Sequence, residues 1–271
     1  MDDQQFRRVL DFFGLSWQGY RKVRKGVKKR LARYMQDQGF RGMESLLASL
    51  ERDPERRAAV EKLLSVSISR FFRDRDLWRA IKEFVFPALI EGENRKIRVW
   101  SAGCARGEEI YSFRILWEEW ARERDQLPEL ELWATDMNPQ ILDKARGGVF
   151  SSSSLKELGE EWRFEYFRPL QATFWAISDS LKIEVWWKVH NLLTDDPPNK
   201  EFQIIFLRNN LLTYYRDELR IPALVKLTEA LSPGGFLMIG SHEKLPKDFT
   251  KIKSTTFHPG IFQKPESVRL S

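Results

Sequence analysis

The stretch "VWSAGCARGEEIYSF", residues 99–113, combines an apolar strand, a loop with two glycines and the start of a helix. The glycines are Gly103 and Gly107, and the helix opens with the carboxylates Glu108 and Glu109. Two acids at a helix start oppose a bound phosphate and favour a ligand that carries positive charge. Acids are also common in the first turn of surface helices, so these residues alone leave both interpretations open.

A third carboxylate, Asp136, follows Thr135 at the end of the next apolar run, "LELWAT". In a doubly wound parallel sheet, ligands bind at the carboxyl ends of the strands, near the switch in strand order. An acid there is suited to accept hydrogen bonds from both hydroxyls of a ribose. The sequence therefore predicts a cofactor that contains a nucleoside.

The loop differs from both common nucleotide-binding motifs. It reads G-C-A-R-G rather than G-x-G-x-x-G, and the chain contains no G-x-x-x-x-G-K-[ST]. S-adenosylmethionine (SAM) carries a sulfonium and an ammonium and has no phosphate, so it suits the acids at the helix start better than a dinucleotide does. We therefore expect SAM as the cofactor.

The acceptor of a methyl group from SAM can be a carboxylate. A glutamate, with a reference pKa of about 4.3, is already ionised at neutral pH and needs no general base, so the enzyme mainly orients the reactants. The chain has three histidines, His190, His242 and His258, without the spacing of metal ligands. This composition is compatible with carboxyl methylation, and we predict no metal site.

The elements that position these residues change character near residue 97. From there, the buried runs "IRVWS", "LELWAT", "FQIIFL" and "FLMIG" alternate with helical stretches, which is typical of a parallel α/β sheet. Between the second and third runs, the alternation around "SDS" predicts a small antiparallel hairpin. We predict one domain at residues 93–271, with a β-subdomain inserted at about residues 151–191.

Residues 1–92 are predicted to form an all-helical domain. Asp53 and Pro54 have the pattern of an N-cap followed by proline at the first helical position. Residues 21–33, "RKVRKGVKKRLAR", place an apolar stripe on one face and carry eight basic residues and no acid. One face of this helix is therefore strongly positive.

The composition indicates a folded protein that works in a reducing compartment. The chain has 271 residues, 42% of them hydrophobic, and this is enough for a sizeable core. The single cysteine, Cys104, excludes an intrachain disulfide. No signal-peptide core and no apolar run of membrane-spanning length occur, so we expect a cytoplasmic protein without membrane insertion. The net charge of +6 favours an acidic partner surface without indicating nucleic acid.

Several segments together resemble the CheR-type chemotaxis methyltransferases. In chain order they are "SISRFFRDRDLW", "VWSAGCARGEEIYSF", "WATDMNPQILDKARGGVF", "NLL", "FQIIFLRNNLLTYY" and "LSPGGFLMIGSHEKLP". The resemblance covers nearly the whole chain. It implies a class I SAM-dependent methyltransferase (Rossmann-like, doubly wound, with a mostly parallel sheet), a small β-subdomain and an N-terminal helical domain. The implied activity is methylation of glutamate side chains of chemoreceptors, which gives a methyl ester and S-adenosylhomocysteine.

The resemblance also implies site residues. In this picture Glu109 contacts a charged part of the methionine moiety and Asp136 the ribose. Together with Gly103 of the loop, the expected cofactor contacts are Ser67, Ser69, Arg73, Glu109, Asp136, Asn191, Leu192, Arg208 and Asn209.

Two residues are expected to act on the reaction itself. Arg73, flanked by Phe71 and Phe72, is placed beside the transferable methyl and would steer the acceptor carboxylate by charge-assisted hydrogen bonds. The alternative for Arg73 is a surface ion pair. The family also has a tyrosine after its R-N pair. Because "RNNLLTYY" is one residue longer than R-N-x-L-x-Y-F, we choose Tyr214, with Tyr215 as the alternative.

Departures from the family pattern keep other functions open. Ser67 stands where asparagine is common, Arg106 replaces a small hydroxyl residue, Ile110 replaces proline and Gln203 replaces aspartate. Unless Arg106 points outward, it adds a cation beside a cationic cofactor. A SAM-binding regulatory or scaffolding protein and a methyltransferase with another acceptor are therefore alternatives. The basic net charge adds a nucleic-acid methyltransferase as a weaker alternative.

The expected partners are the cytoplasmic signalling domains of methyl-accepting chemoreceptors, and no nucleic acid. The basic helix from Arg21 to Arg33 could dock on their acidic, glutamate-bearing helices and steer the encounter. The alternative is that it forms a solvated face.

Overall fold

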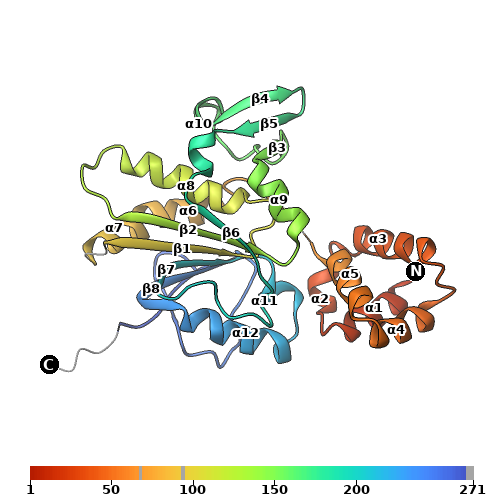
Figure 1. Ribbon diagram of the computed structural model, residues 1–271. Helices are drawn as coiled ribbons and strands as arrows, with labels where there is room; N and C mark the ends of the chain where they lie inside the picture. Colours follow the sequence, from red (N-terminus) through yellow and green to blue (C-terminus); the bar gives the residue numbers. More distant parts are fainter. Residues whose placement is uncertain (67–68, 93–94, 267–271) are drawn as a thin grey trace. The chain divides into compact units, whose positions relative to one another are not determined.

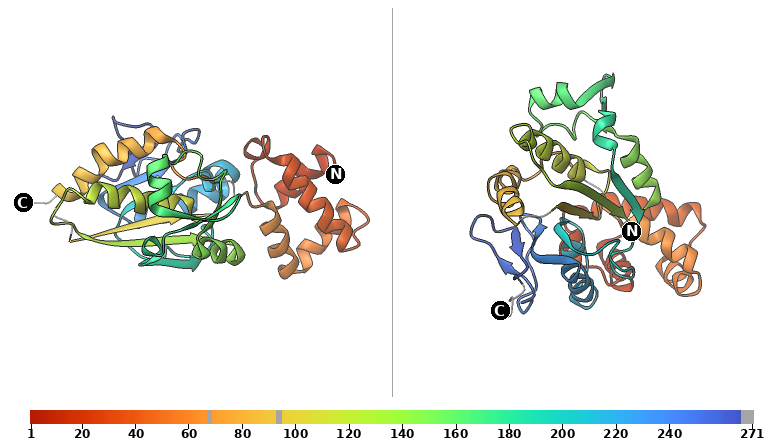
Figure 2. Two further views of the ribbon diagram at one scale, coloured as in Figure 1. Left: turned by 90° about the horizontal axis from the view of Figure 1, so that it is seen from above. Right: turned by 60° about the vertical axis from the view of Figure 1, so that its left-hand side comes forward.

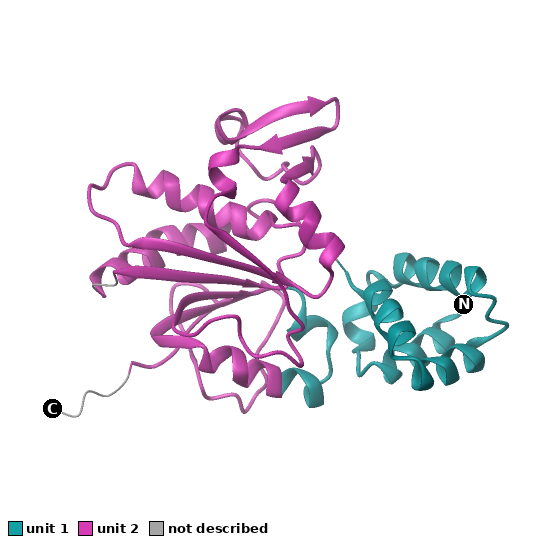
Figure 3. Cartoon of the chain, viewed as in Figure 1, with its two compact units in different colours: residues 1–67, 209–221 teal, residues 68–208, 222–271 magenta. Residues whose placement is uncertain are grey.

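The computed structural model describes residues 1–66, 69–92 and 95–266. The chain divides into two compact units, shown in Figure 3: unit 1 comprises Met1–Ser67 and Asn209–Ile221, and unit 2 comprises Ile68–Arg208 and Pro222–Ser271. The predicted domains 1–92 and 93–271 had their boundary later, because the helices that follow residue 74 pack on the sheet of unit 2. Trp78, for example, stacks on Phe206 with a ring-centroid separation of 5.5 Å. Unit 1 also includes Asn209–Ile221, which the prediction did not assign to it.

Unit 1 is helical, as predicted. Its helices are α1 (Asp3–Phe12), α2 (Trp17–Tyr20), α3 (Arg24–Asp37), α4 (Met43–Arg52), α5 (Pro54–Leu64), α11 (Leu211–Tyr214) and the start of α12 (Asp217–Glu229). The predicted cap of α5 is confirmed, since the Asp53 side chain accepts a hydrogen bond from the Arg56 N–H at 3.0 Å. Val27 and Leu31 of α3 are buried in the core of this unit, so the apolar stripe of the basic helix faces inward.

Unit 2 is built on a seven-stranded sheet in the order β6-β2-β1-β7-β8-β10-β9 (Figure 1). Neighbours among the first five strands pair in parallel, whereas β10 is antiparallel to β8. The chain moves outward from β1 through β2 to β6 and then returns to the other side of β1, so the strand order switches between β1 and β7. The strands are β1 (Lys96–Ala102), β2 (Glu129–Asp136), β6 (Val185–Val189), β7 (Phe202–Leu207), β8 (Leu231–Ile239), β9 (Lys253–Ser254) and β10 (Ile261–Gln263). This is the predicted doubly wound, mostly parallel fold.

Helices cover this sheet on both faces (Figure 1). They are α6 (Arg75–Ala80), the π-helical turn η1 (Ile81–Val85), α7 (Phe86–Glu91), α8 (Glu108–Ala121), α9 (Pro139–Gly147) and the later part of α12. Phe86 of α7 packs edge-on against Phe113 and Trp117 of α8, at 5.6 and 5.1 Å between ring centroids. No helix among the described residues is both long and apolar enough to cross a membrane.

A small antiparallel sheet, in the order β3-β5-β4, projects from unit 2 on the side of α8 (Figure 1 and Figure 2). It contains β3 (Val149–Ser151), β4 (Phe167–Gln171) and β5 (Phe174–Ile177), with α10 (Glu160–Tyr166) before β4 and a 3-10 turn, η2 (Asp179–Lys182), after β5. The prediction of a β-subdomain in this region is confirmed.

The prediction of a hairpin around "SDS" was wrong. The hairpin turn lies earlier, between β4 and β5, and the "SDS" segment leads into η2. The residues that follow form β6, which pairs in parallel with β2 of the main sheet, with Trp186 opposite Trp133. Val185 and Trp187 pack against the main core, and this burial outweighs pairing with the nearby small sheet.

Candidate functional site

The glycine loop connects β1 to α8 at the carboxyl end of the sheet. Gly107 has a φ of 87°, and a Cβ there would lie 3.1 Å from both Trp187 and Tyr111, so this position requires glycine. The N–H groups of Gly103 and Cys104 both donate to the carbonyl oxygen of Thr135, at 2.9 and 2.8 Å. The loop is thus tied to the end of β2, where a cofactor was predicted.

Asp136 is held in one orientation by the backbone around it. One carboxylate oxygen accepts the N–H of Ala105 at 3.1 Å, and the other accepts that of Asn138 at 2.9 Å. Burial raises the pKa of Asp136, and these two hydrogen bonds only partly offset it. Because a carboxylate has about four acceptor positions, each oxygen can still accept a further hydrogen bond. This arrangement is compatible with the predicted contact to a ribose.

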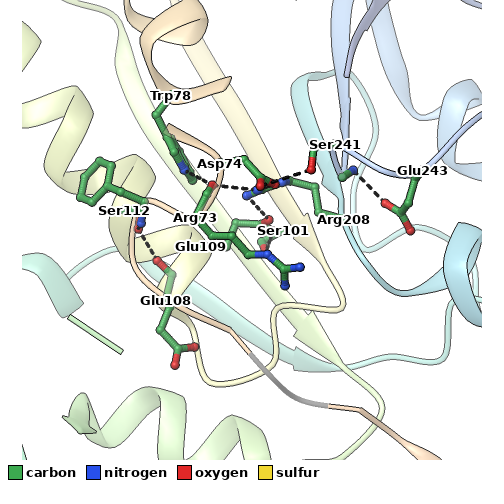
Figure 4. A network of polar contacts seen from close by, with 12 residues as sticks. Arg73, Asp74, Trp78, Ser101, Glu108, Glu109, Ser112, Arg208, Ser241 and Glu243 are labelled. Atoms are coloured by element: carbon green, nitrogen blue, oxygen red, sulfur yellow. Dashed lines mark hydrogen bonds and ion pairs between the residues drawn. The ribbon is translucent and has the colours of Figure 1, made fainter. Parts of the chain in front are cut away.

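Glu109 lies in a polar network that Figure 4 shows. One carboxylate oxygen accepts the Ser101 hydroxyl at 2.6 Å, and the other accepts Nη1 of Arg208 at 3.2 Å. Burial raises the pKa of Glu109, and the charge of Arg208 opposes this rise. The network brings together two predicted cofactor residues, Glu109 and Arg208, from α8 and the end of β7.

Arg208 also joins this network to the segment that contains Arg73. Its Nη2 donates to Asp74 at 2.7 Å and to the carbonyl oxygen of Arg73 at 2.9 Å. The Trp78 indole donates to the same carbonyl at 2.9 Å. Burial raises the pKa of Asp74, but the charge and hydrogen bond of Arg208 outweigh it, so this pKa lies below its ordinary value. The guanidinium of Arg208 therefore bridges the carboxylates of Asp74 and Glu109, and its side chain is only 4% exposed.

The backbone around Arg73 adopts an unusual conformation. Phe72 and Asp74 have φ angles of 50° and 65°, a left-handed region that costs non-glycine residues of order 1–3 kcal/mol. Contacts with α8 hold this segment in place. The Phe72 N–H donates to the Ser112 hydroxyl at 3.0 Å, and that hydroxyl donates to the Glu108 carbonyl at 2.6 Å. Such strain persists only where the surroundings enforce it, as is common at functional sites.

The two phenylalanines beside Arg73 are buried, as their predicted anchoring role requires. Phe71 packs edge-on against Phe150 and Phe167, at 4.8 and 5.1 Å between ring centroids. Phe72 packs edge-on against Trp78 at 5.5 Å. These aromatic contacts fix the backbone on one side of Arg73, and the Arg208 network fixes it on the other.

Glu108 is buried, although its neighbour Glu109 was the expected ligand. Only 3% of the residue is exposed, and no hydrogen-bond partner of Oε2 lies among the described residues. Burial raises the pKa of Glu108, while the charge of Arg106 and a hydrogen bond from the Ser69 side chain lower it. In Figure 4 its side chain points away from the Glu109 network. Ser69 thus interacts with Glu108, and its contact with the cofactor stays a prediction. Ser67 lies outside the described residues.

The raised pKa of Glu108 gives a testable pH dependence. Because the folded protein binds this proton more tightly than the unfolded chain, the acid contributes most to stability below pH 4.5, its ordinary pKa. That contribution is lost as the pH rises through the folded pKa. We expect the wild type to lose free energy of unfolding relative to Glu108→Gln as the pH rises above 4.5, measured by urea denaturation.

The control for this titration is Glu123→Gln at an exposed position. The stability difference between the control and the wild type should stay constant over the same range. A constant difference for Glu108→Gln as well would contradict the burial effect.

The predicted residues Asn191 and Leu192 follow β6 in a turn. Asn191 accepts the Leu193 N–H through its side chain at 3.0 Å and donates its own N–H to Asp195 at 3.0 Å. The N–H of His190, just before this turn, donates to the carbonyl oxygen of Asp136 at 3.1 Å. The structure therefore brings the turn next to Asp136.

Two further predicted residues, Asn209 and Tyr214, belong to unit 1. Asn209 directly follows Arg208 and has a φ of 56°. The Tyr214 ring lies 5.0 Å from that of Tyr20, and its carbonyl oxygen accepts the Ser16 N–H at 2.7 Å. The roles of Asn209 and Tyr214 in cofactor binding and catalysis stay predictions.

Two departures from the family pattern can be followed in the structure. Arg106 is exposed, and its charge lowers the pKa of the neighbouring Glu108. Gln203 accepts the Arg98 N–H at 2.7 Å and donates to the Ser232 hydroxyl at 3.0 Å. It therefore links three neighbouring strands.

Sequence reasoning missed part of the network. Asp74, Ser101, Ser112 and Ser241 were not proposed, although Asp74 lies within the "FFRD" motif. Asp74 accepts the Ser241 hydroxyl at 3.3 Å from a loop far along the chain, a contact that no local pattern indicates. No group of three metal-binding side chains occurs among the residues that the structure describes.

Comparison with known families shows the family to which the chain belongs. A family described as "CheR methyltransferase, SAM binding domain" matches residues 67–259. The chain belongs to this family. It is therefore a SAM-dependent methyltransferase with the class I fold, and the predicted resemblance is confirmed.

Curated relatives cover most of the chain. A chemotaxis protein methyltransferase of Listeria monocytogenes is 32% identical over 82% of this chain and 83% of its own. One from Listeria innocua is 35% identical over 69% of this chain and 70% of its own. Chemotaxis protein methyltransferase 1 of Pseudomonas aeruginosa is 27% identical over 87% of both chains. The similarity thus extends well beyond the glycine loop.

Proposed function

We propose that this protein transfers the methyl group of SAM to glutamate carboxylates of chemoreceptors. The products are a glutamate methyl ester and S-adenosylhomocysteine. The observation that carries the proposal is the network in which Arg208 joins Glu109 to the backbone of Arg73 at the carboxyl end of the sheet. It connects a predicted cofactor ligand to the residue expected to meet the acceptor. The similarity to chemotaxis protein methyltransferases supports the chemotaxis role.

The residues around the glycine loop suit SAM chemically. Three acids, Glu108, Glu109 and Asp136, surround this turn, and the buried Oε2 of Glu108 has no partner among the described residues. Such a group of carboxylates attracts a cation and repels a pyrophosphate. We assign the ribose hydroxyls to Asp136 and the charged methionine portion to Glu109. When bound, SAM supplies an electrophilic methyl group.

Arg73 is assigned to the acceptor. A glutamate carboxylate is ionised at neutral pH, so the protein has no proton to remove and contributes mainly position and charge. A guanidinium can form two parallel hydrogen bonds with a carboxylate and thereby orient one oxygen toward the methyl group. The rigid backbone on both sides of Arg73 would limit its motion and lower the entropic cost of this alignment.

The assignment of Asp136 predicts the effect of a single substitution. Asp136→Asn keeps the size of the side chain, but its amide nitrogen cannot accept a ribose hydroxyl or a backbone N–H. We expect calorimetry to show that Asp136→Asn binds SAM at least about tenfold more weakly than the wild type, because a charged hydrogen bond contributes about 1.5–3 kcal/mol. Asp143→Asn, on the exposed side of α9, is the matched control and should bind SAM as the wild type does. Equal affinities of both variants would remove Asp136 from the site.

The acceptor is tested by mass spectrometry of a chemoreceptor signalling domain after incubation with the protein and SAM. We expect a mass gain of one CH₂ unit on glutamate side chains. A receptor with these glutamates replaced by alanine is the control and should gain nothing. Methylation of DNA or RNA without any receptor methylation would contradict the proposal.

Receptor docking is assigned to the basic helix α3 and the residues just before it. Arg24 and Lys28 form ion pairs with Asp3, at 3.3 and 2.8 Å, and thus belong to the fold of unit 1. The exposed basic residues that remain along the segment are Arg21, Lys22, Lys25, Lys29, Arg30 and Arg33. An acidic receptor helix would gain from this charge mainly in its rate of association. We propose that this encounter takes place in the cytoplasm.

A further inference from the structure

Unit 1 contains a cavity of about 310 Å³ between the start of α1, the end of α3 and the start of α4. Its apolar lining includes Ala32, Met35, Phe40 and Met43. Methionine side chains are flexible and polarisable, so they adapt to the shape of an inserted apolar group. The site described above lies entirely in other residues and leaves this cavity without a role.

The cavity lies on the same face of α3 as part of the basic surface. Lys25, Lys29, Ala32 and Gln36 follow one another at intervals of three or four residues and therefore share one stripe of the helix. Ala32 and Gln36 line the cavity, and both lysines are exposed. Among the described residues, no ion pair involves Lys25 or Lys29, in contrast to Lys28 on the neighbouring row. Positive charge thus stands one to two helical turns from an apolar opening.

We propose that the cavity receives an apolar side chain of an acidic amphipathic helix that lies along α3. Acidic residues of this partner would face Lys25 and Lys29, and its apolar residue would enter between Ala32 and Met35. This inference rests on the proposed docking of α3. It adds a means of fixing the register of the partner helix along α3. Exposed charge pairs attract over a distance but specify position weakly. An apolar anchor that enters a cavity specifies position because only one register fills it.

The test measures binding of a designed peptide to the full chain by fluorescence anisotropy. The labelled peptide is helical, and one of its faces carries Glu, Glu, Leu, Glu and Glu at helical spacing. Because this pattern is symmetric, the peptide can bind in either direction along α3. A matched peptide carries Asn in place of Leu. We expect the wild type to bind the Leu peptide about tenfold more tightly, a ratio that corresponds to about 1.4 kcal/mol.

Substitutions in the protein then separate the anchor from the charge. Ala32→Phe fills the cavity, and Ala48→Phe, on the exposed side of α4, is the matched control. We expect Ala32→Phe to bind both peptides equally and Ala48→Phe to keep the tenfold preference. Because phenylalanine could disturb α3, a second variant, Met35→Gln, makes the cavity wall polar and should also abolish the preference. A variant with Lys25→Glu and Lys29→Glu should weaken both peptides by a similar factor.

An unchanged preference in both Ala32→Phe and Met35→Gln would overturn the proposal. Self-association of the wild type that is lost in Ala32→Phe, seen by sedimentation, would identify a second copy as the occupant and would also overturn it. Receptor methylation is measured in parallel on the same variants. Intact methylation without any peptide preference contradicts the cavity proposal alone, whereas a tenfold preference without receptor methylation contradicts the proposed function alone.

Discussion

Replacing Arg208 by methionine is expected to lower the free energy of unfolding by about 3–5 kcal/mol. The Arg208 side chain is 4% exposed and pairs with both Asp74 and Glu109. Methionine fills a similar volume but leaves these two carboxylates without their cation, and an uncompensated charge in a buried site is costly. The same substitution removes one of the two donors to the Arg73 carbonyl oxygen. Urea denaturation followed by circular dichroism measures the loss.

The matched control for this prediction is Arg79→Met on α6. Arg79 is exposed and pairs with Asp76 at the surface, so its loss should change stability by less than about 1 kcal/mol. A triple variant that combines Arg208→Met with Asp74→Asn and Glu109→Gln should recover part of the loss, because it removes the unpaired charges. A loss below about 1 kcal/mol for Arg208→Met alone would contradict the bridging role.

Arg73→Ala is expected to lower the rate of methyl transfer about 100- to 1,000-fold while the fold stays intact. A guanidinium that orients a reacting carboxylate toward the methyl group contributes on this scale, because a small misplacement of the reacting atoms can cost about 100-fold in rate. The fold should survive because Trp78 and Arg208 bond the carbonyl oxygen of Arg73, which alanine retains. The measurement is the turnover number at saturating SAM and receptor, together with a thermal unfolding curve.

Two further variants give the Arg73 prediction its controls. Arg70→Ala, at an exposed position three residues earlier, should keep normal turnover. Arg73→Lys keeps the charge without the planar pair of donors and should recover part of the lost rate. Near-normal turnover of Arg73→Ala would remove this residue from its proposed role.

The sequence predicted those features of the fold that depend on local patterns. The four apolar runs became β1, β2, β7 and β8, and the helical periodicity before residue 90 became the helices α1 to α7. The cap at Asp53 was predicted because capping depends on neighbouring residues alone. Gly107 was predicted as part of the loop, and its positive φ explains why glycine stands there.

Features that depend on distant contacts were not predicted. The segment Val185–Val189 has the alternation of a hairpin strand, but its partner is β2 of the main sheet, some fifty residues earlier. Likewise, the role of Asp74 depends on Arg208 and Ser241, which the fold brings together from separate loops. A pattern of residue types along the chain does not indicate which of several compatible strands or side chains becomes the partner in the folded protein.

The adjacent acids at the start of α8 illustrate the same limit. Successive residues of a helix point about 100° apart, so the two carboxylates must face different surroundings. Sequence alone cannot assign which surroundings each one meets. In the structure, Glu109 accepts hydrogen bonds from Ser101 and Arg208, whereas Glu108 interacts with Ser69.

The most direct test of the central claim uses SAM with a tritiated methyl group and a chemoreceptor signalling domain. After incubation with the wild-type protein, the receptor is isolated and treated with base, and the volatile radioactivity is counted. A glutamate methyl ester releases its label as methanol, so we predict base-labile label that depends on both the protein and the receptor. Label that stays on the receptor in base, or the absence of label from every receptor offered while SAM still binds, would contradict carboxyl methylation.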